Sequence, residues 1–209
     1  MNPVTHRQNL NAIRRFFDGH APRWDAMVGK SHGDRLMQLL AGVEFPKAGR
    51  ILDIGTGTGV LWPILRRYTG DGTRLTAIDV APVMLAEARL AQGAFSADIL
   101  VADGQEMPFA EASFAGVFCN SCFPHFEDQA RALAEMMRVL IPGGMLLICH
   151  SESRAAINHR HHEVGGIVGG HDLPDPDTLV AMAAAAGARV RQAFDTDAGY
   201  LFIGTKPAA

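Results

Sequence analysis

Ile51-Leu52-Asp53-Ile54-Gly55-Thr56-Gly57-Thr58-Gly59 reads as an apolar strand that ends in an acid and continues into a glycine-rich turn. Three glycines at every second position leave no Cβ between the backbone and a ligand, and they permit backbone angles that other residues avoid. Residues 60–68 are apolar at helical spacing, so the turn opens a helix whose free N–H groups and positive dipole end face the same spot. Strand, turn and helix together predict a nucleotide-type site of the doubly wound α/β class.

The spacing of the glycines distinguishes between nucleotides. Dinucleotide folds use G-x-G-x-x-G, in which the first helical turn meets a pyrophosphate. Here the pattern is Asp53-x-Gly55-x-Gly57-x-Gly59, and an acid stands where an incoming phosphate would be repelled. The pattern favours a ligand with a cationic amine, and it resembles motif I of the class I S-adenosylmethionine-dependent methyltransferases. Two alternatives stay open at this point, a nicotinamide-dependent oxidoreductase and a non-catalytic sensor that binds a cofactor or a metal.

Two further strands end in acids. Asp79 closes the strand at 74–79 and lies twenty residues after Gly59, the separation at which an acid accepts hydrogen bonds from both ribose hydroxyls. Asp103 closes the strand at 99–103, and the resemblance implies that its side chain accepts from the exocyclic amine of adenine. The acids at 53, 79 and 103 are therefore expected on one rim around one cofactor, S-adenosylmethionine. The predicted cofactor-binding residues are Asp53, Gly55, Thr56, Gly57, Gly59, Asp79, Val80, Met84, Asp103, Gly104 and Asn120, with Met84 placed against the adenine by resemblance or else in the core.

The remaining segments complete the predicted fold. Strands are expected at 114–120, 145–150, 190–194 and 200–205, and helices at 4–17, 34–40, 60–68, 80–92, 128–140 and 178–186. This order predicts an α/β, Rossmann-like, doubly wound and mostly parallel seven-stranded sheet, with a C-terminal antiparallel hairpin and helices on both faces. We interpret residues 1–209 as a single methyltransferase domain. Its expected parts are an N-terminal helical cap (1–45), a cofactor-binding core (46–150), a histidine-rich insert or lid (151–175) and a closing helix and hairpin (176–209).

Two stretches narrow the resemblance. Phe-Phe-Asp-x-x-Ala-x-x-Trp-Asp at 16–25 and Arg-Val-Leu-x-Pro-Gly-Gly at 138–144 resemble small-molecule methyltransferases of the ubiquinone/menaquinone-type group. In that group such an N-terminal cap closes over cofactor and substrate. The alternative interpretation of residues 4–17 is an amphipathic helix that covers a sheet edge.

Composition limits the partners. The 209 residues include 48% hydrophobic and 20% charged residues, and the formal net charge of −3 gives no electrostatic footprint for nucleic acid or an anionic membrane. No apolar run approaches the roughly 20 residues that span a bilayer, and three cysteines do not form a disulfide framework. We therefore expect a cytoplasmic protein whose partner is a small-molecule methyl acceptor, without nucleic acid or membrane. The oligomeric state and the accepting atom stay open.

Histidines are the candidate catalytic groups. The resemblance implies a cofactor whose methyl group is already activated, so the protein must align the acceptor for in-line displacement. A phenol or enolate acceptor also needs a base, and imidazole titrates near neutral pH. The candidates are His125 in the loop after the fourth strand, His150 at the end of the fifth strand, and His161 in the insert. The alternative interpretation is that each of these histidines only makes a local hydrogen bond in its loop or at its strand end.

A metal site is the last hypothesis from the sequence. Cys119-x-x-Cys122-x-x-His125, Cys149 and the histidine-rich insert provide the sulfur and imidazole ligands that transition metals select. A divalent transition metal is predicted to bind through His150, His161 and His171. The alternative is that these histidines form a polar lid over the substrate.

Overall fold

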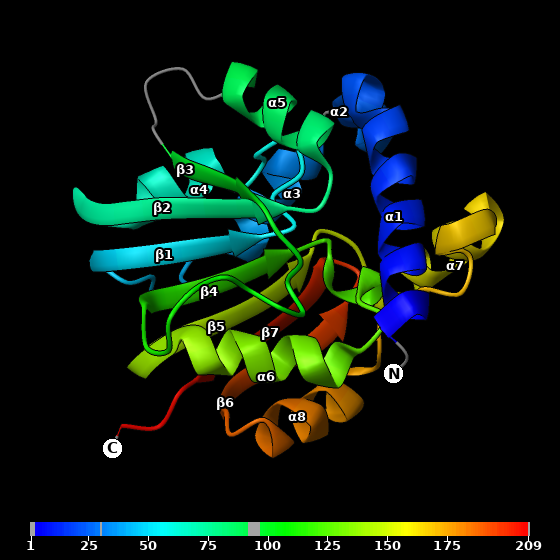
Figure 1. The fold of residues 1–209 in the computed structure, drawn as a ribbon. Helices are drawn as coiled ribbons and strands as arrows, with labels where there is room; N and C mark the ends of the chain where they lie inside the picture. Colours follow the sequence, from blue (N-terminus) through cyan, green and yellow to red (C-terminus); the bar gives the residue numbers. More distant parts are fainter. Residues whose placement is uncertain (1–2, 30, 92–96, 209) are drawn as a thin grey trace.

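The computed structural model describes residues 3–29, 31–91 and 97–208, and within them seven strands form one sheet in the order β3-β2-β1-β4-β5-β7-β6 (Figure 1). The pairs from β3 to β5 are parallel, whereas β7 runs antiparallel between β5 and β6. This arrangement confirms the predicted Rossmann-like sheet and its C-terminal hairpin. The strands are β1 (Ala48–Ile54), β2 (Gly72–Asp79), β3 (Ala97–Val101), β4 (Phe114–Asn120), β5 (Leu140–His150), β6 (Arg189–Thr196) and β7 (Gly199–Thr205).

Both faces of the central strands are covered, which is why these strands read as continuous apolar runs. Alternate residues point to opposite faces: Ile51 belongs to one buried cluster and Leu52 to the other. Helices α3 (Ser31–Leu39), α4 (Trp62–Tyr68) and α5 (Pro82–Ala91) contribute to the first cluster. Helices α6 (Gln129–Val139) and α8 (Pro176–Ala185) contribute to the second, and Figure 1 shows them along the lower face of the sheet.

The N-terminal segment lies beyond the carboxyl ends of the parallel strands. Helix α1 (Pro3–His20) stands past the arrowheads of β1 and β2 in Figure 1, and the 3-10 helix η1 (Ala21–Arg23) and α2 (Trp24–Val28) follow it. The short η3 (Gly166–Val168) contacts both α1 and helix α7 (Arg154–Val164). The loop after β4 contains the 3-10 turn η2 (Phe123–His125). These segments enclose the edge at which ligands bind in open parallel sheets.

Several element boundaries differ from the predictions. Helix α7 was not expected, because only Ile157 of its residues is buried and its sequence lacks an apolar stripe. Its first turn is instead fixed by Ser153, whose hydroxyl accepts a hydrogen bond from the Ala156 N–H. Helix α4 begins at Trp62 rather than at residue 60, since the glycine turn continues to that point. Gln92, the predicted end of the fourth helix, lies outside the described residues.

Within the described ranges, every helix is either too short or too polar to traverse a lipid bilayer.

Candidate active site

A cavity of about 830 Å³ opens at the carboxyl ends of the parallel strands. Its size is within the range of small-molecule and cofactor sites. Nine of the eleven predicted cofactor residues line it, namely Gly55, Thr56, Gly57, Asp79, Val80, Met84, Asp103, Gly104 and Asn120. Asp53 and Gly59 are absent from the cavity wall. Of the predicted histidines, His125 and His171 line the cavity, whereas His150 and His161 do not.

The three glycines of the turn have different reasons to be glycine. All three have positive φ, at +63° for Gly55, +55° for Gly57 and +85° for Gly59, a region that side chains with a Cβ rarely adopt. A Cβ on Gly55 would lie 2.2 Å from the Cys122 sulfur, so the turn is packed directly against the loop after β4. A Cβ on Gly57 would meet no atom of the described chain within 4 Å. Gly57 therefore presents bare backbone to the cavity.

Asp53 does not lie on the rim where the sequence placed it. Its Oδ2 accepts hydrogen bonds from the Thr56 hydroxyl at 2.6 Å and from the Trp62 indole N–H at 3.1 Å. The carboxyl group is 1% exposed, and this burial raises its pKa to about 7. The contacts point toward α4, away from the cavity, because Asp53 and Ile54 face opposite sides of the sheet. Asp53 holds the glycine turn in shape, and the expectation of three acids around one ligand is corrected to two.

Asp79 connects the glycine turn to the start of α5. Its two carboxylate oxygens accept from the Gly57 N–H and the Ala81 N–H, each at 2.9 Å. Burial raises the pKa of Asp79 to about 6, against the lowering effect of these hydrogen bonds. The carboxylate is 8% exposed and lines the cavity beside Val80 and Met84. It lies where the resemblance expects ribose hydroxyls.

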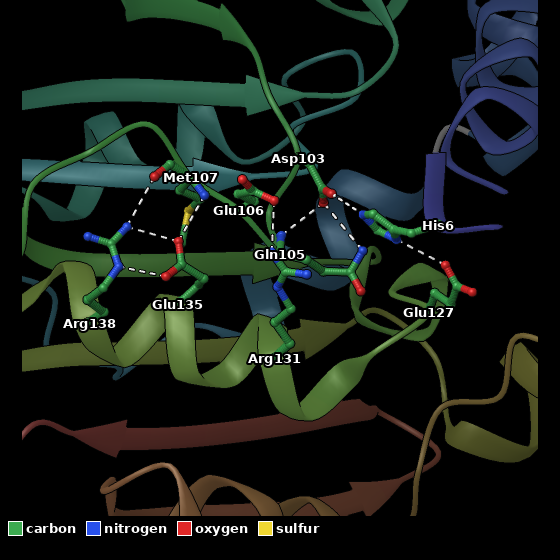
Figure 2. A network of polar contacts seen from close by, with 9 residues as sticks. All are labelled: His6, Asp103, Gln105, Glu106, Met107, Glu127, Arg131, Glu135 and Arg138. Carbon is green, nitrogen blue, oxygen red and sulfur yellow. Dashed lines mark hydrogen bonds and ion pairs between the residues drawn. The ribbon is translucent and has the colours of Figure 1, made fainter. Parts of the chain in front are cut away.

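Asp103 is bound by a residue that the sequence analysis missed. The His6 ring of α1 bridges Asp103 Oδ2 at 2.8 Å and Glu127 Oε2 at 3.0 Å (Figure 2). Burial lowers the pKa of His6, but the hydrogen bonds to Glu127 and Asp103 outweigh it and raise the pKa above its usual 6.5. His6 is thus hydrogen-bonded to Asp103, the carboxylate that the resemblance assigns to the adenine amine. The sequence carried no signal for this contact, because 97 residues separate the two partners.

The loop after β3 is held from below by α6. Glu135 accepts from the Met107 N–H at 2.8 Å, and Arg138 donates to the Met107 carbonyl (Figure 2). Arg138 also donates to the Phe109 carbonyl. The hydrogen bond to Arg138 is the main reason that the pKa of Glu135 is lowered. Gln105, also unpredicted and 3% exposed, accepts from the Asp128 N–H at 2.7 Å. These bonds fix Asp103 and Gly104 at the cavity.

The N-terminal segment makes two more polar contacts near the cavity, one with the glycine turn and one with α5. Asp25 of α2 accepts from the Thr58 hydroxyl of the glycine turn at 2.6 Å. Asp18 of α1 accepts from the Val83 N–H in the first turn of α5 at 2.9 Å. Phe17 and Trp24 pack against the small buried cluster of Ala21, Ala81 and Met84. The stretch at 16–25 is therefore attached to the walls of the predicted cofactor site.

The end of β4 is strained at the cavity. Ser121 has φ +55°, which is uncommon for a residue other than glycine. Its N–H donates to the Cys149 carbonyl at 2.9 Å, and its hydroxyl donates to the Asn120 side-chain oxygen at 3.3 Å. Strained backbone of this kind persists where the surroundings fix it, and it occurs preferentially at functional sites. Asn120, Ser121 and Cys122 all line the cavity.

Three histidines from separate elements meet beside this loop. His125 Nδ1 lies 3.0 Å from His171 Nδ1, and the His125 and His161 ring centroids are 4.9 Å apart. His161 Nδ1 donates to the His171 carbonyl at 2.5 Å. Burial is the main cause that lowers the pKa of all three, and that of His125 falls well below its usual value. These imidazoles are neutral at physiological pH.

His150 is sealed inside the protein. It is 1% exposed, and neither ring nitrogen has a hydrogen-bond partner in the described part of the chain. Burial lowers the pKa of His150 to about 3, and its ring packs edge-on against Tyr200. Because His150 does not reach the cavity, its position does not suit the predicted role of base.

The metal hypothesis is not supported. Among the residues that the structure describes, no group of three His, Cys, Asp or Glu side chains is arranged to hold a metal ion. His161 and His171 are adjacent, but His150 lies apart from the cavity that His171 lines. The three cysteines are free; Cys119 and Cys149 are buried, and Cys122 packs on Gly55. The set His150, His161 and His171 is therefore withdrawn as a metal site.

The charge of the cavity wall fits a cationic cofactor. Six acids line it, namely Asp25, Asp79, Asp103, Glu127, Asp128 and Asp172, and no Lys or Arg does so among the described residues. Together with the open backbone over Gly57, this wall suits the sulfonium and ammonium charges of S-adenosylmethionine. A diphosphate would meet acids without a basic partner, which counts against the nicotinamide alternative.

Comparisons with known proteins agree with this geometry. A family model described as "Methyltransferase domain" matches residues 52–148. The chain is 32% identical over 209 residues to a demethylmenaquinone methyltransferase of Thermus thermophilus, covering 84% of this chain and 92% of that protein. A demethylmenaquinone methyltransferase of Deinococcus radiodurans is 29% identical over 219 residues, which cover 90% of each chain.

Solved structures share the fold. An S-adenosylmethionine-dependent methyltransferase from Aquifex aeolicus has a TM-score of 0.68 at 20% identity, covering 90% of this chain and 96% of that one. The [4+2]-cyclase SpnF has a TM-score of 0.76 at 19% identity, covering 94% and 96%. Since one fold supports different reactions, the activity follows from the sequence relatives and the site. The chain belongs to the class I S-adenosylmethionine-dependent methyltransferases of the ubiquinone/menaquinone-type group, enzymes that transfer a methyl group to a small-molecule acceptor.

Proposed function

We propose that the acceptor is a hydroxylated aromatic ring of the hydroquinone class, methylated on a ring carbon, and that His125 is the general base. The observation that carries the proposal is the His125 imidazole in a cavity wall that holds apolar side chains of α1 and no Lys or Arg among the described residues. The names of the Thermus and Deinococcus relatives support the same class of acceptor.

Part of the cavity wall is apolar. Leu10, Ile13 and Phe17 of α1 face the cavity together with Phe126 and Ile167. Such a wall accommodates a flat apolar ring, which gains stability by leaving water. The ring hydroxyl then meets the polar groups at the end of β4. This division into an apolar wall and a few polar groups is typical of small-molecule sites.

The same wall disfavours anionic acceptors. The chain is also 35% identical over 152 residues to a malonyl-[acyl-carrier protein] O-methyltransferase of Halorhodospira halophila, covering 70% of this chain and half of that protein. A malonyl carboxylate buried here would have no Lys or Arg among the described lining residues to pair with it. An unpaired buried charge is costly. The geometry therefore favours a neutral acceptor over a carboxylate.

Bound S-adenosylmethionine supplies a methyl carbon that its sulfonium sulfur has already activated. The chain's own contribution is to orient the acceptor ring and to remove a proton from its hydroxyl at His125 Nε2. Loss of that proton raises the electron density of the ring carbon next to the hydroxyl, which makes it a nucleophile. Burial lowers the pKa of His125, so the ring is unprotonated near neutral pH and keeps a lone pair for the acceptor hydroxyl, while the proton that it takes up must be passed on.

The test compares acceptors in the presence of S-adenosylmethionine. Purified protein would receive demethylmenaquinone in its reduced and its oxidised form, and separately a malonyl thioester, with methylated products identified by mass spectrometry. We expect product from the reduced hydroquinone alone. Methylation of the malonyl thioester without methylation of the hydroquinone would contradict the proposal.

The role of the base is tested by substitution. His125→Ala should lower kcat by about 10²-fold or more, the scale of general base catalysis, and leave the Kd for S-adenosylmethionine unchanged. His159→Ala is the matched control, because His159 is a largely exposed histidine on α7, paired with Glu163. Equal turnover by both variants would remove His125 from this role.

A further inference from the structure

Two imidazoles stand side by side in the cavity wall, one from η2 and one from the loop after η3. His125 Nδ1 and His171 Nδ1 are 3.0 Å apart, and both residues are half-buried. At this distance one nitrogen carries the hydrogen and the other accepts it. A neutral histidine carries one ring hydrogen, so this single contact decides which atoms of the pair are free.

One of the two arrangements leaves a base at the cavity. When the hydrogen is on His125 Nδ1, the lone pair of His125 Nε2 is free, and His171 carries its own hydrogen on Nε2. Within the described part of the chain, no hydrogen bond uses His125 Nε2, and this atom is not sealed from solvent as the His150 nitrogens are. His125 Nε2 is therefore available to an acceptor hydroxyl.

Neighbouring groups hold the pair in place. The Phe17 ring packs edge-on against His125 with centroids 5.1 Å apart. The His125 N–H donates to the Cys122 carbonyl at 2.9 Å, and the His171 N–H donates to the Val168 carbonyl at 3.0 Å. His161 adds its bond to the His171 carbonyl. The contact between the two rings is thus fixed from α1, η2, η3 and α7.

Replacement of a ring hydrogen by a methyl group releases one proton in every turnover, and the cavity must pass it on. We propose that His171 is the second half of a two-imidazole proton relay that carries this proton from His125 to solvent. The inference rests on the proposed function, because only an acceptor that loses a proton uses the relay.

The bonds in the relay balance. The acceptor O–H bond breaks as an N–H bond forms at His125 Nε2. Once the neighbouring ring carbon has gained the methyl group, its C–H bond breaks and an O–H bond re-forms on the acceptor, so one proton per turnover leaves by the relay. The Nδ1–H bond of His125 then breaks as an N–H bond forms at His171 Nδ1. His171 releases its Nε2 hydrogen to solvent as a proton, and both rings are neutral again with their hydrogens on the opposite nitrogens. Ring rotation or the reverse exchange through water restores the starting tautomers.

Surrounding charges give the relay a direction. The titratable groups around His125 are His150, His161 and His171, and burial is the main cause that disfavours a proton held on His125. His171 faces His161 and Asp172, and the Asp172 carboxylate favours a proton on His171. Arg160 and His162 act on His161, and His162 pairs with Asp172 at 3.0 Å. The proton is thus drawn outward, toward the exposed side of the insert.

His171→Asn separates the relay from simple positioning. The asparagine side-chain oxygen takes the place of Nδ1 and accepts from His125, so it keeps the base oriented, but it cannot pass a proton on. With demethylmenaquinol we expect kcat to fall by about 10-fold or more near neutral pH, with an unchanged Kd for S-adenosylmethionine. In His171→Ala, added imidazole should restore turnover. His159→Asn, an exposed histidine on α7, is the control and should behave as wild type.

Different outcomes overturn different claims. If His171→Asn matches wild type in kcat across the pH profile, or if imidazole fails to restore His171→Ala, the relay is wrong while the proposed function stands. A second readout does not use activity: in ¹⁵N-histidine-labelled protein, the shared Nδ1–Nδ1 hydrogen should give a resonance that either His125→Ala or His171→Ala removes. Its absence from wild type would also overturn the relay. A wild-type protein that shows this resonance but methylates no hydroquinone would instead refute the proposed function, and the relay with it.

Discussion

At the scale of single residues, Gly55 and Gly57 share a positive φ but have different surroundings. Gly57→Ala should cost about 1–2 kcal/mol from backbone strain and block cofactor binding, because its Cβ enters the open space of the cavity. Gly55→Ala should lower Tm further, since its Cβ would lie 2.2 Å from the Cys122 sulfur. Differential scanning fluorimetry gives Tm, and isothermal titration calorimetry gives the Kd for S-adenosylmethionine.

The comparison between these two variants is the informative one. A Gly57→Ala protein that binds the cofactor like wild type would show that the ligand does not lie on this backbone. Equal losses of Tm in the two variants would show that strain alone, rather than the contact with Cys122, governs position 55.

Asp79 is the carboxylate through which the turn and the cofactor are expected to be linked. Asp79→Ala removes an acceptor of the Gly57 and Ala81 N–H groups as well as the proposed ribose contact. We expect the binding free energy of S-adenosylmethionine to weaken by about 1.5–3 kcal/mol, the usual worth of a hydrogen bond to a charged group. Asp98→Ala is the control, because Asp98 is an exposed acid at the far end of β3. An unchanged Kd in Asp79→Ala contradicts the assignment.

At the scale of elements, His6 links α1 to the loop after β3 and to Glu127 before α6. The pKa of His6 is raised, so the protonated ring is stabilised by the two carboxylates below that pKa, and the contact weakens as pH rises through it. Hydrogen exchange of α1, corrected for its intrinsic pH dependence, should therefore speed up from about pH 6 to about pH 8.

His6→Gln should remove this pH dependence of exchange in α1. The control is His20→Gln in the same helix, where the histidine only bonds to the Phe16 carbonyl. If α1 of wild type and of His6→Gln protein respond to pH in the same way, the bridge does not hold the helix.

At the scale of the whole molecule, buried titratable groups predict a stability maximum between about pH 6 and pH 7. Asp53 has a folded pKa of about 7, above its usual 3.8, so the stability present at low pH is lost as pH rises through 7. His32, His125, His150, His161 and His171 have lowered pKa values, so the stability present above 6.5 is lost as pH falls below it. Urea denaturation from about pH 5 to about pH 8 gives the unfolding free energy at each pH and so measures the loss on either side of the maximum.

The Asp53→Asn variant tests the loss of stability that rising pH causes. Asparagine resembles the protonated carboxyl group and can still accept from Thr56 and Trp62 through one oxygen, the same atom that Asp53 uses for both bonds. The part of the unfolding free energy that wild type loses as pH rises from 3.8 to about 7 should therefore shrink in this variant, and Asp98→Asn should leave it unchanged. If Asp53→Asn loses as much unfolding free energy with rising pH as wild type does, another group causes the loss.

The sequence by itself determined the sheet and the cofactor class, and it predicted nine residues that the structure places on the cavity wall. Strands that are buried on both faces, the glycine spacing after Asp53, and acids at the ends of the next two strands are local patterns with direct physical causes. Because parallel strands end at one edge, these patterns already placed Gly57, Asp79 and Asp103 together. Helix α7 escaped prediction, since its residues form no apolar stripe and a serine cap starts it.

Only the tertiary structure decided what each polar side chain faces. Alternation along β1 turns Asp53 toward Trp62 rather than toward the ligand, and burial at the end of β5 removes His150 from the reaction. His125 and His171 are 46 residues apart and His6 and Asp103 are 97 apart, so no local pattern relates them. Such contacts depend on how helices and loops pack over the sheet edge, and that packing is fixed by the whole core at once.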